Sequence, residues 1–251
     1  MILAINIGNT NFMIACDDEK TVYRYPVADL RVSDNFKDVV NDFLRCKIPG
    51  GVIISSVVPA LTGTITSAIY EMFNIKPIVV NSDMHMSIDL SLYDKKFLGS
   101  DRIAVSEAVF DKTGKAGIVY DFGTATTINV VNSRGFFLGG AILPGVKMGL
   151  ISLSQNTAQL PEYKDPLALP PLLGQNTADC LLSGAVYGNA TMVDSMSARI
   201  KEFLQEDADV YMTGGNASFI AQACNTNIIL EPNLLIQGLY SLYNKNKKEE
   251  K

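Results

Sequence analysis

The feature that most constrains this fold is a strand, turn and strand unit that occurs twice along the chain. Residues 2–16 read ILAINIGNTNFMIAC, a buried apolar run followed by a glycine turn and an alternating return run. Residues 115–131 read KAGIVYDFGTATTINVV and repeat the arrangement. The two openings align with Asn6 on Asp121 and with the glycines of the two turns on each other. This pattern predicts two hairpins in two copies of one structural unit, which we expect to face each other.

Strands and helices alternate after each hairpin, which predicts an α/β protein with mixed sheets and helices on their faces. In the first half we expect strands at 20–27, 50–59 and 76–82 and helices at 34–46 and 61–73. In the second half we expect helices at 144–155 and 177–205, a strand, glycine turn and helix at 208–224, and a closing helix at 231–245.

The repeat suggests how the 251 residues divide into domains. We predict an N-terminal domain at 1–114, a C-terminal domain at 115–246 and a charged tail at 247–251. The proline-rich segment 161–174 is not expected to form regular structure, and we consider it a candidate mobile flap.

Composition excludes several classes of function. The formal net charge of −5 provides no general basic field for a nucleic-acid backbone. No apolar run approaches the ~20 residues of a membrane helix. The four cysteines are spread singly, as in reduced cytoplasmic proteins, and the single histidine leaves acid–base chemistry to carboxylates, lysines or tyrosines. We therefore expect a cytoplasmic protein with no nucleic-acid partner and no membrane partner.

Three glycine turns follow three predicted strands, in AINIGNTNF, DFGTATT and TGGNA. Such a turn directs backbone N–H groups at one point, which suits a phosphate. Two hairpins of this kind are able to clamp a triphosphate between two domains. Gly214 and Gly215 allow a flat ring or a ribose to approach the backbone closely. Taken singly, the first turn fits an ordinary hairpin equally well.

The segment KKFLGSDRIAVSEAVF places an acidic residue, Asp101, and a basic residue, Arg102, at the start of a predicted helix. One interpretation is a helix cap made by Ser100 or Asp101. In the other, Asp101 accepts a proton from a substrate hydroxyl, while Arg102 holds a substrate carboxylate or phosphate. The segment alone leaves both open.

Six motifs in this order and spacing together resemble the type III pantothenate kinase family: INIGNTNF, LGSDR, DFGTATT, GGAILPG, NTADCLLSG and TGGNA. The resemblance runs from Met1 to about Tyr243. It implies the acetate and sugar kinase/actin-like superfamily, with two ribonuclease-H-like domains and ATP in the cleft between them. It also implies phosphorylation of pantothenate, the first step toward coenzyme A, by a homodimer that uses magnesium and a monovalent cation such as potassium or ammonium.

The resemblance assigns roles to individual residues. Asp101 becomes the catalytic base that activates the pantothenate hydroxyl, and Asp121 binds the monovalent cation. Thr177 touches pantothenate in a pocket that is completed across the dimer. The residues expected to bind ATP are Asn6, Ile7, Gly8, Asn9, Thr10, Asn11, Phe12, Met13, Thr124, Gly214 and Gly215. The residues expected to bind pantothenate are Tyr93, Gly99, Ser100, Asp101, Arg102 and Thr177.

The chain departs from the family pattern at two positions. Family members usually carry Asp where this chain has Asn6, which keeps an oxygen ligand for magnesium but removes its charge. The usual substrate-binding Tyr precedes Asn-Pro, seven positions before the glycine, whereas Tyr93 lies six positions before Gly99 and is followed by Asp94.

Asn6 also motivates an alternative function, a regulator that binds nucleotide or pantothenate but has lost the chemistry. A third possibility is a kinase or phosphatase of the same superfamily that acts on another small substrate, because one fold hosts many activities.

Overall fold

The computed structural model describes the chain apart from residues 17–20, 29–32, 46, 163–168 and 248–251. The chain divides into two compact units. The first combines Met1–Thr113 with the C-terminal segment that starts at Asn233, and the second is Gly114–Pro232. Each unit is built on a five-stranded sheet with helices packed on it, so the expected α/β class is confirmed.

The sheet of the first unit has the strand order β3-β2-β1-β4-β5. Strand β1 pairs antiparallel with β2 and parallel with β4, so the first hairpin continues into a parallel layer. The strands are β1 (Ile2–Ile7), β2 (Asn11–Cys16), β3 (Val22–Pro26), β4 (Gly51–Ser56) and β5 (Ile78–Val79). The helices are α1 (Ser33–Leu44), α2 (Pro59–Phe73), α3 (Ser100–Thr113) and α7 (Leu234–Asn246), with a short 3-10 helix η2 (Lys95–Phe97).

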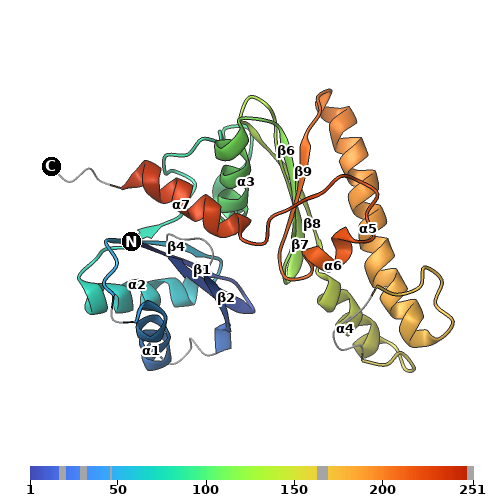
Figure 1. Ribbon diagram of the computed structural model, residues 1–251, viewed down its shortest axis with the longest axis horizontal. Helices are drawn as coiled ribbons and strands as arrows, with labels where there is room; N and C mark the ends of the chain where they lie inside the picture. Colours follow the sequence, from blue (N-terminus) through green and yellow to red (C-terminus); the bar gives the residue numbers. More distant parts are fainter. Residues whose placement is uncertain (17–20, 29–32, 46, 163–168, 248–251) are drawn as a thin grey trace. The chain divides into compact units, whose positions relative to one another are not determined.

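Alternation along β1 assigns its two faces to different helices. Leu3, Ile5 and Ile7 are fully buried in a core that includes residues of α1 and α2. Helices α3 and α7 cover the opposite face, as Figure 1 shows. Ala4 and Asn6 alternate with the core residues and therefore face α3 and α7. The sheet is thus covered by helices on both faces, which explains why most of β1 is apolar.

The second unit repeats this topology. Its strand order is β10-β9-β6-β7-β8, which matches the first sheet when β6 takes the place of β1. The strands are β6 (Gly117–Phe122), β7 (Ala125–Val131), β8 (Phe137–Pro144), β9 (Asp209–Thr213) and β10 (Ile229–Leu230). The helices are α4 (Val146–Asn156), α5 (Thr177–Leu204) and α6 (Ala217–Ala221). Asn6 and Asp121 occupy the same place, one residue before the end of the first strand of each hairpin.

The closing helix differs from expectation. The predicted second domain at 115–246 includes residues 234–246, but these form α7, which belongs to the first unit. The contact with α3 is so close that a Cβ added at Gly238 would collide with the backbone of Ala104. The end of the predicted domain was wrong because position in the sequence does not report packing between distant helices.

Two further expectations fall partly outside the described residues. The candidate flap at 161–174 includes residues 163–168, and the tail at 247–251 includes residues 248–251. Among the residues that the structure describes, no helix is long and apolar enough to cross a membrane.

Candidate active site

The turn of the first hairpin is closed by its own backbone. The N–H of Gly8 donates to the carbonyl oxygen of Asn11 at 3.0 Å, so it is committed to the turn. A Cβ at Gly8 would lie 2.9 Å from that oxygen, which is too close for a side chain, and this explains why a glycine occupies the position. The side chains of Ile7 and Phe12 are fully buried, so these two residues can offer a phosphate only backbone groups.

Asn6 lies one residue before the end of β1, and its side-chain oxygen is buried. The residue is 7% exposed, and among the described residues its Oδ1 has no hydrogen-bond partner. Asn6 lies beside Ser55 in the parallel β1–β4 pair, so both side chains share the face that α3 covers. A buried acceptor without a donor is costly, which indicates an oxygen kept for a ligand.

The start of α3 is attached to β4 through Ser100. The Ser100 hydroxyl lies 2.9 Å from the Ser55 hydroxyl, accepts from the N–H of Ser56 at 2.9 Å and lies 3.0 Å from the Ser56 carbonyl oxygen. This hydroxyl therefore points into the domain and fixes where the helix begins. A direct contact between Ser100 and a substrate stays a prediction.

Asp101 occupies the first turn of α3, where both interpretations of the sequence placed it. Its Oδ1 accepts from the N–H of Arg102 at 2.8 Å. A Cβ at Gly99 would lie 2.5 Å from the same oxygen, so only glycine leaves the carboxylate in this position. Burial raises the pKa of Asp101 above its ordinary value, although the N–H and the charge of Arg102 act in the opposite direction. A carboxylate with a raised pKa suits proton transfer.

Arg102 and Tyr93 meet beside Asp101. The Nη1 of Arg102 donates to the Tyr93 hydroxyl at 3.3 Å, and the guanidinium carbon lies 5.8 Å from the centre of the Tyr93 ring. Arg102 is only 8% exposed. The structure thus brings Tyr93, Gly99, Asp101 and Arg102 together at one end of α3.

The second unit gathers a matching group of turns. A Cβ at Gly214 would lie 2.5 Å from Oδ1 of Asp121, and one at Gly123 would lie 3.6 Å from the same atom. Gly145, which precedes α4, packs so closely on the carbonyl groups of Gly123 and Thr124 that no side chain fits. The glycines of two turns therefore lie beside Asp121, and Gly145 lies against Thr124. A Cβ at Gly215 would meet no atom within 4 Å, so the backbone there is open to a ligand.

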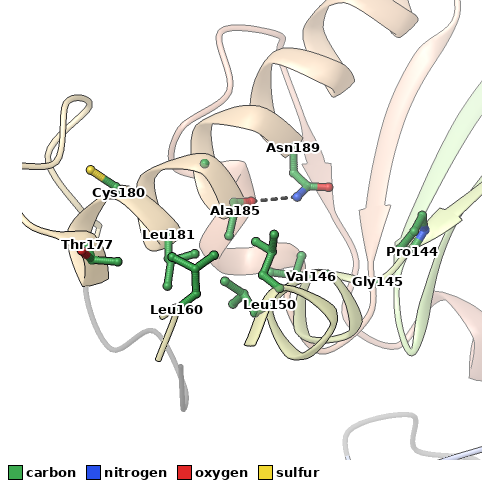
Figure 2. Close-up of a pocket in the computed structure, with 13 residues that line it drawn as sticks. Pro144, Gly145, Val146, Leu150, Leu160, Thr177, Cys180, Leu181, Ala185 and Asn189 are labelled. Atoms are coloured by element: carbon green, nitrogen blue, oxygen red, sulfur yellow. Dashed lines mark hydrogen bonds between the residues drawn. The ribbon is translucent and has the colours of Figure 1, made fainter. Parts of the chain in front are cut away.

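Thr177 lies in another part of the second unit, at the start of α5. It lines an apolar cavity of about 500 Å³ between α4 and α5, which Figure 2 shows. Val146, Leu150, Leu160 and Leu181 line the same cavity.

Sequence reasoning missed Ser55 and Gly145 as parts of these sites. Gly145 belongs to GGAILPG, and a glycine directly after a strand end is a signal that could have identified it. Ser55 carries no such signal, because a serine inside a strand is ordinary. Among the described residues, no group of three or more His, Cys, Asp or Glu side chains is arranged to hold a metal ion.

These features define the class of protein. A sheet that is duplicated in strand order, with a glycine hairpin in each copy, is the two-domain actin-like ATPase/sugar kinase architecture expected from the sequence. A Campylobacter jejuni structure described as a Baf family transcriptional activator matches with a TM-score of 0.62, 22% identity and coverage of 96% of this chain and 97% of that chain. A Sinorhizobium meliloti structure described as a 2-dehydro-3-deoxygalactonokinase matches with a TM-score of 0.59, 11% identity and coverage of 97% and 98%. These likenesses establish the fold.

The sequence comparisons identify the family. The model of the type III pantothenate kinase family matches residues 2–199. The type III pantothenate kinase of Geotalea uraniireducens is 34% identical over 257 residues, with 99% of this chain and all of that protein covered. The one from Geobacter sulfurreducens is 33% identical, with the same coverage. This chain belongs to the type III pantothenate kinase family.

Proposed function

We propose that the protein is a kinase that transfers the γ-phosphoryl group of ATP to the primary hydroxyl of pantothenate, the first step toward coenzyme A. The observation that carries the proposal is the position of Asp101, between Gly99 and Arg102 at the start of α3, in a chain of this family. The function inferred from the sequence and the function of the relatives agree.

Each side chain of the site has its own role in phosphoryl transfer. Asp101 accepts the proton of the pantothenate hydroxyl as that oxygen attacks phosphorus. Arg102 holds the pantothenate carboxylate in its planar fork, and Tyr93 orients the guanidinium through their hydrogen bond. The two hairpins and the TGG turn bind the nucleotide and fix its phosphates. Catalysis then rests mainly on positioning and on the neutralisation of charge.

Asn6 fits a role toward a divalent metal. Its buried Oδ1 without a partner is the kind of oxygen that Mg²⁺ accepts, directly or through water. Bound magnesium would neutralise the negative charge of the phosphates. Because Asn6 carries no formal charge, it would bind the magnesium ion more weakly than an Asp would.

Three finer assignments belong to the same proposal. Asp121 would bind a monovalent cation, potassium or ammonium, beside the glycines of the two turns next to it. The protein would form a homodimer in which Thr177 completes the pantothenate pocket of the partner. The singly spread cysteines support a cytoplasmic location.

The direct test is formation of phosphopantothenate coupled to ATP consumption, with magnesium present and potassium exchanged for sodium in parallel. We expect product that depends on potassium. A panel of other hydroxy acids and sugars tests the substrate, and one that is used better than pantothenate would contradict the assignment.

Replacing Asn6 by Asp tests the role of this residue. We expect the magnesium concentration for half-maximal activity to fall by about tenfold, because the added charge strengthens the metal ligand. Without magnesium the variant should melt at a lower temperature than the wild type, since an unpaired charge is then buried. Thermal unfolding with and without magnesium and ATP measures this second effect.

The same variant separates the kinase from the regulator. If only the variant turns over pantothenate, the natural protein is a regulator that kept its ligand sites. If both forms turn over at similar rates with the same magnesium requirement, Asn6 is not a degenerate metal ligand.

The raised pKa of Asp101 predicts a pH dependence. The base must be ionised, so kcat/KM should fall as the pH falls through this pKa, and the fall should begin at a higher pH than an ordinary Asp would give.

The effect of Asp101 on stability has the opposite sense, because the folded state favours protonated Asp101. That contribution is present below the ordinary Asp pKa and is lost as the pH rises through the raised one. A pH profile whose acid limb lies at the ordinary Asp pKa would count against Asp101 as the base.

A further inference from the structure

A fully buried carboxylate on α3 has no part in the mechanism above. Glu107 is 0% exposed and lies five residues after Arg102 on the same helix. Burying a carboxylate is expensive unless it is well hydrogen-bonded, and an apolar residue often fills such a place at lower cost. The partners of Glu107 therefore indicate what the carboxylate is for.

Two backbone partners of Glu107 lie on the loop that carries Tyr93. This loop, residues 80–94, runs from β5 to η2. The Oε2 of Glu107 accepts from the N–H of Ser87 at 2.8 Å and from the N–H of Ile88 at 3.2 Å. Two consecutive backbone donors on one oxygen fix the loop in position and in direction. Ile88 is itself buried and Ser87 is half-buried, so removal of the carboxylate would leave the N–H of Ile88 without a partner in a buried place.

From this anchor the loop reaches Tyr93 in a short turn. Leu90 is buried, and its carbonyl oxygen accepts from the N–H of Tyr93 at 3.1 Å. The Tyr93 hydroxyl then accepts from Arg102. Helix α3 therefore holds the loop near Ile88 and again at Tyr93. Near Ile88 it does so through Glu107 and through Asp111, which accepts from the Ser87 hydroxyl at 2.9 Å, and at Tyr93 it does so through Arg102.

The other oxygen of Glu107 faces the C-terminal helix. Its Oε1 accepts from the Ser241 hydroxyl at 3.0 Å and lies 3.8 Å from Nζ of Lys245. Asp111, one turn further along α3, contacts the same two residues, at 2.8 Å and 2.7 Å. Helix α7 thus supports the helix side of the anchor. It also holds the loop directly, because the Asn246 side chain accepts from the N–H of His85 at 2.9 Å and donates to its carbonyl oxygen at 2.7 Å.

We propose that Glu107 is a positioning residue for the substrate site, because it holds the loop against α3 in the register at which Tyr93 meets Arg102. The proposal rests on the proposed function, in which Tyr93 and Arg102 form the carboxylate end of the pantothenate site. Glu107 acts through the loop and touches no substrate.

Three variants test this role. Glu107→Met keeps the length and apolar packing of the side chain but removes the acceptor. Glu107→Gln keeps one oxygen for the two N–H groups, and Ser241 can accept from its amide. Ser241→Ala is the control, because it removes the two bonds from α7 to Glu107 and Asp111 and leaves the bonds from Glu107 to the loop. We expect the KM for pantothenate to rise by about tenfold or more in Glu107→Met, with the KM for ATP changed by less than about twofold.

The pattern across the variants decides the result. Glu107→Gln should restore the KM for pantothenate to near the wild-type value, and Ser241→Ala should lower the melting temperature without a change in this KM. A purely structural role would make Glu107→Met and Ser241→Ala alike, with lower melting temperatures and no selective effect on pantothenate. That result would overturn the proposal.

Hydrogen exchange gives a readout that does not depend on turnover. The amides of Ser87 and Ile88 should exchange faster in Glu107→Met than in the wild type, while the strands β1 and β4 keep their protection. If the wild type makes no phosphopantothenate, the proposed function fails, but faster exchange confined to the loop still supports the anchor. If Glu107→Met does not fold, pantothenate should slow the exchange of these two amides in the wild type, and no change would overturn the proposal.

Discussion

Replacing Asp101 by Asn is expected to abolish most turnover while the protein stays folded and still binds ATP. General base catalysis contributes about 10²- to 10⁴-fold, and kcat should fall by a factor in this range. Asn has nearly the same shape and can still accept from the N–H of Arg102, so α3 should begin as it does now. The loss would then report the missing base.

Stability provides an independent check on the same variant. Since burial raises the pKa of Asp101, its ionised form is unfavourable in the folded protein near neutral pH. An Asn removes this cost, so the variant should melt at the same temperature as the wild type or higher. A variant that is inactive and also unstable would indicate that the carboxylate supports the fold, and its loss of turnover would then not report a missing base.

Asp94→Asn is a suitable control. Asp94 caps η2 by accepting from the N–H of Lys96 at 3.1 Å, and Asn caps a helix equally well. It lies next to Tyr93 but has no place in the mechanism. Steady-state kinetics and calorimetry with ATP should separate the two variants, and near-normal turnover in Asp101→Asn would remove Asp101 from its role.

The duplication was predictable because local patterns determine it. A buried apolar run, a glycine and an alternating run specify a hairpin within about fifteen residues, and both hairpins form where they were expected. The alignment of Asn6 with Asp121 follows from the same patterns. The α/β class could then be inferred from the alternation of strands and helices, whereas the strand order was not predicted.

Features that depend on contacts between distant segments were not predictable. The sequence of α7 is amphipathic in an ordinary way, and nothing in it reports that Gly238 packs on Ala104 of the first unit. The position of the Ser100 hydroxyl depends on Ser55 and Ser56, about 45 residues earlier. The burial of Glu107 could not be predicted either, because it requires the loop and α7 together.

Substitution of Gly214 by Ala is expected to destabilise the second unit strongly. Gly214 has a φ of +93°, a conformation that side chains rarely adopt. A Cβ there would lie 2.5 Å from the carbonyl carbon of Phe122, 2.7 Å from its nitrogen and 2.5 Å from Oδ1 of Asp121. Backbone atoms inside a sheet cannot move aside, so the turn after β9 must shift away from β6.

The neighbouring glycine supplies the matched control. A Cβ at Gly215 meets nothing within 4 Å and its φ is not in the left-handed region, so Gly215→Ala should change stability by no more than about 1 kcal/mol. Gly214→Ala combines backbone strain with overpacking, each of which costs about 1–3 kcal/mol. Urea denaturation followed by circular dichroism compares the two variants. Because Asp121 is displaced as well, Gly214→Ala should also lose any stimulation by potassium. Equal midpoints for the two variants would mean that the close contact between the TGG turn and the second hairpin does not hold this unit together.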